Sequence, residues 1–276
     1  MQKEILAQST PVFDLYAPKT QKLIGILSIP HSGETIPPLF EDYLTKEYRH
    51  RFEDVDTKVD HLVDIEKLQE KGIAVIVAHI QRVCVDLNRA PEMCVLNWKK
   101  NSMGEVLVLK DIAKELEQEL IAKYHTPYFE MIKSLINALE RNMSTPSFID
   151  LHSMPSRPTE YHLKITPNQA LERPDFCVSD VNGTTCEKDF IDFVCHNLRK
   201  GYPVINQNAP YFGGHITRRV DELFPNANNI QIEIKRGNYL DEVSKELIQN
   251  KVEKIKPILT QTLIATFEHF YEKYKR

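Results

Sequence analysis

The sequence predicts an α/β fold with a mostly parallel or mixed β-sheet and helices on both of its faces. Short apolar runs, which are typical of buried strands, alternate along the chain with segments that carry apolar residues at helical spacing. Strands that alternate with helices favour a sheet that is covered on both faces. No repeat, low-complexity tract or linker divides residues 1–276, so we expect a single domain.

The first buried strand is predicted at residues 22–30, where KLIGILSIP is rich in Ile and Leu and stops at a proline. Apolar residues at helical spacing predict a helix over 58–70, and Gly72 then opens a second strand, GIAVIVAHI, at 72–80. Further apolar runs predict strands at 147–151, 175–179 and 229–234.

Helices are predicted in three later parts of the chain. Two amphipathic helices are expected within 105–142, with Thr126-Pro127 as the cap and first-turn proline between them. Residues 187–199 are predicted to be helical. Residues 241–274 are expected to form one long helix or two helices jointed at Pro257.

The composition is that of an ordinary globular protein and argues against some partners. The chain is 42% hydrophobic and 27% charged, and its formal net charge of -4 gives no field to attract nucleic acid or an anionic membrane. No apolar run has the length of a signal peptide or a membrane span. The five scattered cysteines form no CxxC pair, which predicts reduced, mostly buried thiols in a cytoplasmic protein.

Chemistry-bearing residues stand where the predicted strands end. His31, Arg82, His152 and Glu233 each follow or close an apolar run. Because ligands of open α/β sheets bind outside the carboxyl ends of the strands, these residues are candidates for one site.

Two of these strand ends carry candidate metal ligands. His31 is followed three residues later by Glu34, so both could reach one ion within a single turn, and imidazole and carboxylate both suit Zn²⁺. His152 closes the strand at 147–151, and Asp150, on the same strand face, could orient its imidazole. A hydrogen-bonded structural histidine is the alternative for His152.

The segment from Arg82 to Arg89 is hard to explain by packing alone. Arg82, Asn88 and Arg89 follow a buried strand, and guanidinium groups bind carboxylates in a bidentate manner. The alternative is a structural pair between an arginine and Asp86.

Glu233 lies within the apolar run NIQIEI. A carboxylate is costly to bury as an ion, so Glu233 should titrate upward or meet a cation. Beside an activated water it could act as general base and then general acid in amide hydrolysis. Strand alternation also allows it to face solvent.

The loop at 211–219, YFGGHITRR, is interpreted as a lid or specificity loop. Gly213 and Gly214 would let the backbone approach a ligand or hinge a closure. Arg218 or Arg219 could reach a second substrate carboxylate. The alternative is a glycine turn before a helix with exposed arginines.

Taken in order, these motifs resemble the zinc carboxypeptidase and aspartoacylase group, and more closely the N-formylglutamate amidohydrolases. The resemblance is carried by PHSG at 30–33 with Ile36-Pro37, the Arg82–Arg89 segment, YFGG at 211–214 and IQIE at 230–233 through Tyr239. The matches run from about residue 25 to 245, nearly the whole chain. Their joint occurrence in order is more specific than any one of them.

The resemblance implies a zinc-dependent exopeptidase-like fold and hydrolysis of an N-acyl amino acid. The natural substrate would be N-formyl-L-glutamate, cleaved to formate and L-glutamate, as in histidine degradation. It also implies roles for particular residues: zinc ligands His31 and His152, general base Glu233, carbonyl-polarising Arg82, and carboxylate-binding Asn88 and Arg89.

The third metal ligand is left open between two acids. Glu34 is preferred on geometry. In the family that position is often not acidic, so Asp56, from the run EDVD at 53–56, is the alternative.

Two other functions remain as alternatives. One is a related zinc amidase or carboxypeptidase that acts on another N-acyl amino acid or a short peptide. The other is a non-catalytic α/β protein that binds anions through Arg82, Arg89 and Arg218. The acyl group, the amino acid and the oligomeric state stay open.

Overall fold

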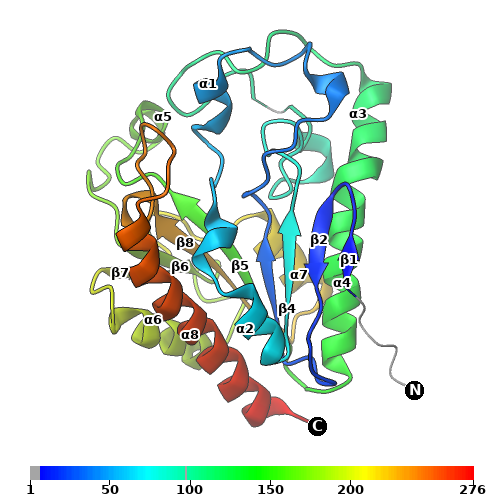
Figure 1. Ribbon diagram of the computed structural model, residues 1–276, viewed down its shortest axis with the longest axis vertical. Helices are drawn as coiled ribbons and strands as arrows, with labels where there is room; N and C mark the ends of the chain where they lie inside the picture. Colours follow the sequence, from blue (N-terminus) through cyan, green and yellow to red (C-terminus); the bar gives the residue numbers. More distant parts are fainter. Residues whose placement is uncertain (1–6, 97) are drawn as a thin grey trace.

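An eight-stranded mixed sheet runs through the centre of the computed structural model, which describes residues 7–96 and 98–276 (Figure 1). The strand order is β1-β2-β4-β3-β5-β8-β6-β7. The strands are β1 (Gln8–Ser9), β2 (Phe13–Tyr16), β3 (Gly25–Ile29), β4 (Ile73–Ala78), β5 (Ser147–Met154), β6 (Phe176–Ser179), β7 (Ile205–Gln207) and β8 (Asn228–Lys235). The central strands β4, β3, β5 and β8 are parallel, whereas β1–β2, β2–β4 and β6–β8 pair antiparallel. The predicted α/β class with a mostly parallel or mixed sheet is confirmed.

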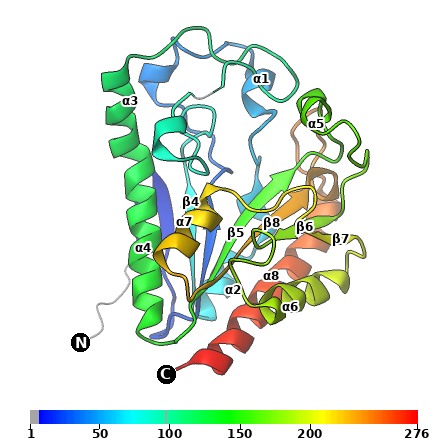
Figure 2. The ribbon, with the colours of Figure 1, turned by 180° about the vertical axis from the view of Figure 1, so that it is seen from behind.

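Helices cover both faces of this sheet (Figures 1 and 2). One face is covered by α2 (Ile65–Glu70), α6 (Lys188–Arg199) and α8 (Gln249–Tyr274), and the other by α4 (Thr126–Glu140) and α7 (His215–Leu223). Successive residues of β3 therefore enter different cores: Ile26 packs towards α4, and Leu27 packs towards α8. Because side chains alternate along a strand, burial on both faces produces the continuous apolar runs that predicted the strands.

The remaining helical segments lie mainly around the carboxyl ends of β3 and β4, at the top of Figure 1. They are α1 (Tyr48–Phe52), α3 (Lys114–Leu120), α5 (Glu160–Ile165), 3₁₀ turns at Pro38–Phe40, Val59–Leu62, Pro91–Met93 and Arg236–Asn238, and a π-helical turn at Ile121–His125. The long connections after β3 and β4 are thus gathered at the edge of the sheet where the candidate residues stand.

Three helix predictions need correction. The helix expected over 58–70 is divided, because Asp64 accepts a hydrogen bond from the Lys67 backbone and starts a new helix after the 3₁₀ turn. The helices expected within 105–142 begin only at Lys114 and are joined by the π-helical turn. The last helix is a single one with Pro257 inside it, on an exposed position, and it begins at Gln249.

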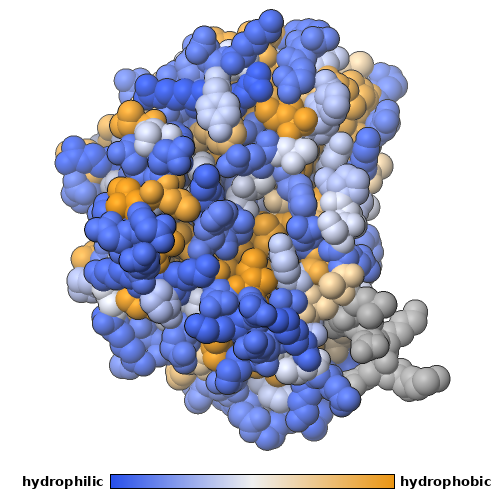
Figure 3. Space-filling view, viewed as in Figure 1, coloured by the Kyte–Doolittle hydropathy of each residue, from blue (hydrophilic) through white to orange (hydrophobic). Residues whose placement is uncertain are grey.

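The surface seen in Figure 3 is mainly hydrophilic, with hydrophobic atoms in small separate patches. Within the described residues, no helix combines the length and apolarity that a membrane crossing requires. All five cysteines are unpaired, and four of them are buried.

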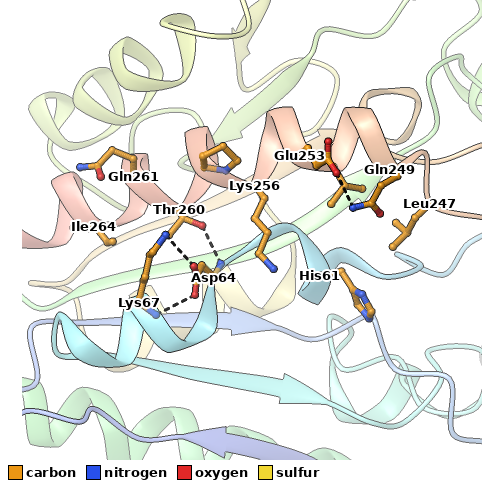
Figure 4. A pocket seen from close by; sticks show the side chains of 12 residues that line it. His61, Asp64, Lys67, Leu247, Gln249, Glu253, Lys256, Thr260, Gln261 and Ile264 are labelled. Atoms are coloured by element: carbon orange, nitrogen blue, oxygen red, sulfur yellow. Dashed lines mark hydrogen bonds and ion pairs between the residues drawn. The ribbon is translucent and has the colours of Figure 1, made fainter.

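A groove of about 620 Å³ lies between α2 and α8 (Figure 4). Its lining mixes acidic, basic and amide side chains, and Lys67 is already paired with Asp64 at 3.2 Å. None of the candidate site residues lines it.

Candidate functional site

The strand register brings the candidate histidines and the candidate glutamate together. His31 lies two residues beyond the end of β3, and β3 pairs in parallel with β5. Within β5, His152 stands opposite Glu233 of β8. The imidazole rings of His31 and His152 are 4.8 Å apart between centroids, so the two histidines can reach one ion.

Asp56 completes a buried group with these two histidines. His152 Nδ1 is 3.1 Å and His31 Nδ1 is 3.5 Å from Asp56 Oδ2. One nitrogen or oxygen from each of the three residues lies within 4.8 Å of the others. The Asp56 backbone donates to the His31 carbonyl at 3.1 Å, which fixes the loop against the end of β3. We call His31, Asp56 and His152 the His-Asp-His group.

A second carboxylate lies behind each imidazole. His31 Nε2 is 2.8 Å from Asp86 Oδ1, and His152 Nε2 is 2.7 Å from Asp150 Oδ2. Asp150 also accepts from Ser28 Oγ at 2.7 Å. A carboxylate behind a ring nitrogen holds the proton there and turns the other nitrogen, here Nδ1, towards the centre.

The charges of the site stabilise one another. Burial alone would raise the pKa of Asp86, but Arg82 and His31 outweigh it and hold that pKa well below its usual range. Burial would likewise lower the pKa of His152, but Asp150 and Asp56 outweigh it and raise that pKa well above its ordinary value. Without a metal, these carboxylates therefore favour the protonated form of His152.

The His-Asp-His group fits a divalent metal. His31 Nδ1 is buried and has no hydrogen-bond partner among the described residues, although it points at the carboxylate of Asp56. Two imidazoles and one carboxylate, with each imidazole supported by a further carboxylate, form a donor set that suits Zn²⁺ and leaves a coordination position for water or substrate.

Glu34 does not lie with the histidines. Its side chain is exposed, and Asp56, the alternative acid, takes the place beside them. After His31 the chain runs along the end of β4 instead of turning back: Thr35 donates to the His79 carbonyl at 2.9 Å. A Cβ on Gly33 would lie 2.4 Å from the backbone of His79, so this close path depends on the glycine. The structure thus places Asp56, and not the geometrically preferred Glu34, beside the two histidines.

Glu233 is buried, 7% exposed, so the solvent-facing alternative does not apply. Its Oε1 accepts a hydrogen bond from Gln231 Nε2 at 2.7 Å. Burial raises the pKa of Glu233 to about 8, with His152 opposing the rise and Asp56 adding to it. A carboxyl group with that pKa can both accept and release a proton near neutral pH.

Arg82 forms the structural pair that the sequence left as an alternative. Its Nη2 is 2.7 Å from Asp86 Oδ2, its Nη1 donates to the Asp54 carbonyl at 3.1 Å, and its guanidinium lies 5.1 Å from the Trp98 ring. Its buried Nε has no hydrogen-bond partner among the described residues. Arg82 is thus fixed by the protein and retains one free donor.

Asn88 and Arg89 differ from each other in placement. Asn88 Oδ1 accepts from the Ile216 backbone at 2.8 Å, in the first turn of α7. A Cβ on Gly214 would lie 2.2 Å from the Asn88 amide, so the glycine at this position leaves room for the Asn88 side chain. The side chain of Arg89 is 51% exposed and its Nε is 3.7 Å from Asp86.

The loop at 211–219 leads into α7. Gly213 has φ +110°, a conformation that favours glycine, and His215 begins the helix. Arg218 is exposed over the Phe212 ring, and Arg219 is exposed and paired with Glu222. The alternative of a glycine turn before a helix with exposed arginines describes this segment.

Two buried arginines of the site were not predicted. Arg236 donates to Ser153 Oγ at 3.1 Å and lies 3.3 Å from Asp56 Oδ1, so it holds the carboxylate that faces the histidines. Its position three residues after Glu233, at the end of the same strand, was the available signal. Arg173, in the segment between α5 and β6, is 4% exposed, and nothing in its local sequence marks it.

Comparison with known proteins gives a family and a fold. The family model for N-formylglutamate amidohydrolases matches residues 25–240. The crystal structure of N-formylglutamate amidohydrolase from Ralstonia eutropha JMP134 is similar at a TM-score of 0.81 and 24% identity, over 94% of this chain and 98% of that one. The gene product Atu2144 from Agrobacterium tumefaciens is similar at a TM-score of 0.68 and 16% identity, over 94% and 96%. No curated protein sequence matches.

The family match spans most of the chain and includes both candidate histidines, Asp56 and Glu233. The fold of the solved relatives extends over nearly the full length of both chains. The chain belongs to the N-formylglutamate amidohydrolase family.

Proposed function

We propose that this protein is a zinc-dependent amidohydrolase that cleaves N-formyl-L-glutamate to formate and L-glutamate. Family membership supports hydrolysis of a linear amide. The observation that carries the proposal is the buried Glu233 opposite His152, next to a His-Asp-His group whose donor atoms suit a metal. A cytoplasmic location, supported by the five unpaired cysteines, belongs to the same proposal.

The His-Asp-His group would hold zinc through the Nδ1 atoms of both histidines and the carboxylate of Asp56. Zinc bound there supplies Lewis-acid chemistry, which increases the acidity of a water molecule and polarises a carbonyl. Asp86 and Asp150 keep the two Nε2 atoms protonated, and Arg236 fixes Asp56. The ligands are thereby oriented before any substrate binds.

Glu233 moves the proton. Its Oε1 is engaged by Gln231, which leaves Oε2 to accept a proton from the water that attacks the amide carbonyl. The same oxygen then donates that proton to the leaving amine, so one carboxyl group serves as base and then as acid. Arg82, with its free Nε, is assigned to the negative charge that develops on the carbonyl oxygen.

Arg89, with Asn88 beside it, remains our candidate for the α-carboxylate of the substrate. The half-exposed guanidinium makes a contact of 3.7 Å with Asp86, which leaves its other donors free to meet a ligand. Gly213, Gly214, Arg218 and Arg219 are a weaker candidate, because Gly214 packs against Asn88 and both arginines face solvent.

A substrate panel tests this function. Purified protein is supplied with Zn²⁺ and assayed for amine release on N-formyl, N-acetyl and N-succinyl amino acids with acidic, amide and apolar side chains. We expect equal amounts of formate and glutamate, with N-formyl-L-glutamate the preferred substrate. Preference for another acyl group or a short peptide would favour the related zinc amidase or carboxypeptidase. Anion binding without any hydrolysis would favour the non-catalytic alternative.

A further inference from the structure

Arg173 is a buried cation that no carboxylate among residues 7–96 and 98–276 neutralises. It is 4% exposed, and its Nε is buried with no hydrogen-bond partner in the described part of the chain. No carboxylate among those residues forms an ion pair with it, and the contact that its guanidinium does make is with the Tyr211 ring, 5.5 Å from the centroid. A buried charge is destabilising unless it is paired.

Two other arginines of the site, the partly buried Arg82 and the buried Arg236, show how this protein pairs a structural guanidinium. Arg82 lies 2.7 Å from Asp86, and Arg236 lies 3.3 Å from Asp56. Each therefore has a buried carboxylate supplied by the chain. Arg173 has no such partner within the described ranges, which favours an anion from outside the chain as its counter-ion.

A second hydrogen-bond donor stands beside Arg173. His162 Nδ1 accepts from the Thr159 backbone at 3.2 Å, so in the neutral ring the proton is on Nε2. That Nε2 lies 3.1 Å from the Tyr211 hydroxyl and donates to its oxygen. The hydroxyl proton of Tyr211 is then free for another acceptor. Burial and the charge of Arg173 lower the pKa of His162, which favours this neutral form.

This pair of donors lies next to the proposed reaction centre. Ser179 Oγ donates to the Tyr211 carbonyl at 2.7 Å and fixes the residue at the end of β6. β6 pairs with β8, and Cys177 of β6 lies opposite Glu233 of β8. The charges of Glu233 and Arg173 both act on the Tyr211 hydroxyl. A ligand held by Arg173 and Tyr211 would therefore extend towards Glu233.

We propose that Arg173 and Tyr211 bind the side-chain carboxylate of the N-acyl amino acid and select substrates with an acidic side chain. A guanidinium and a phenol hydroxyl together offer the planar, charge-assisted contacts that a carboxylate accepts. The proposal rests on the proposed function, and it leaves the α-carboxylate to Arg89.

The test compares two substrates that differ in one group, N-formyl-L-glutamate and N-formyl-L-glutamine. Arg173→Met should lower kcat/KM by about 10- to 100-fold for the acid and by little for the amide. Tyr211→Phe should do the same to a smaller extent. The matched control is Arg157→Met, because Arg157 is 74% exposed and paired with Glu172 in the same part of the chain. Equal losses on both substrates would overturn the proposal, as would a loss that follows the α-carboxylate in an α-amide analogue.

Binding without turnover separates this proposal from the function on which it rests. Calorimetry is used to compare glutarate with its monoamide on wild type and Arg173→Met. If wild type hydrolyses no N-acyl amino acid, the hydrolase function fails. Even then, binding of glutarate that Arg173→Met weakens at least about tenfold would support a carboxylate site at Arg173. Glutarate binding that is unchanged in Arg173→Met would overturn the site, whether or not the wild type hydrolyses formylglutamate.

Discussion

The His-Asp-His group and the arginine-bearing segments beside it differ in how firmly they are held. The members of the group are at most 2% exposed, and each is held by further groups: Asp86 behind His31, Asp150 behind His152, and Arg236 beside Asp56. Arg89, Arg218 and Arg219, in contrast, are exposed. The side chains of the His-Asp-His group are thus held in place, whereas the exposed arginine side chains can move.

This difference indicates where selectivity and catalysis should be sensitive to mutation. Side chains that are held by neighbouring hydrogen bonds keep their geometry without a bound metal. Mutation of one of these proposed ligands should therefore have a large effect on catalysis. Exposed guanidinium groups are solvated and contribute little until a ligand orders them. Arg173 differs from these arginines, because it is buried and has no ion-pair partner in the part of the chain that the structure describes.

The largest effect is expected at Asp56. Asp56→Asn removes an anionic ligand and leaves Arg236 without its carboxylate, so bound metal should be lost and kcat/KM should fall by about 10³ or more. Metal content is measured by mass spectrometry and turnover by formate release. Glu34→Gln is the matched control, and it should retain both because its side chain is exposed. The reverse outcome would restore Glu34 as the third ligand.

Glu233→Gln is expected to separate metal binding from proton transfer. The amide keeps the shape of the side chain and removes the proton acceptor, so kcat should fall by a factor of about 10² to 10⁴ while the metal stays bound. Glu222→Gln, an exposed acid on α7, is the control and should be neutral. Full turnover by Glu233→Gln would require another base.

Metal uptake should release protons. The pKa of His152 is raised in the metal-free protein, so its proton must leave before Nδ1 can bind a metal. Lowering the pH below this raised pKa should therefore weaken metal affinity by about tenfold per pH unit. Calorimetry in buffers of different ionisation enthalpy measures the released proton. Uptake of metal without proton release would show that His152 is neutral or is not a ligand.

The smallest effects are expected at the surface arginines of α7. Arg218→Met and Arg219→Met should each change kcat/KM for N-formyl-L-glutamate by less than about fivefold, because both guanidinium groups are exposed and an exposed ion pair such as Arg219–Glu222 contributes roughly 0–1 kcal/mol. The same assay on Arg173→Met provides the comparison. A decrease in kcat/KM of tenfold or more in the Arg218→Met or Arg219→Met variant would indicate that the loop at 211–219 acts as a lid or determines specificity.

The strands and their ends could be predicted from the sequence because burial on both faces leaves long apolar runs. His31, His152 and Glu233 were found from their positions at or near those ends, and the structure brings them together. Short strands such as β2 (Phe13–Tyr16) and β7 (Ile205–Gln207) were missed, since three or four residues carry too little pattern.

The misplaced residues depend on tertiary structure. Glu34 is close to His31 in sequence, but the segment after β3 follows β4 and carries it to the surface. Asp56 reaches the histidines through a backbone contact with His31 that no local spacing encodes. Arg173 is recognised by the absence of a counter-ion among the described residues, which becomes visible only in three dimensions.

A metal held by the His-Asp-His group should be required for amide hydrolysis. The most direct measurement is formate release from N-formyl-L-glutamate before chelation, after removal of metal, and after return of one equivalent of Zn²⁺. We expect one metal per chain, loss of turnover on chelation, recovery with zinc, and no recovery in His31→Ala or His152→Ala. Undiminished turnover by the metal-free protein, or stoichiometric metal retained by both histidine variants, would contradict it.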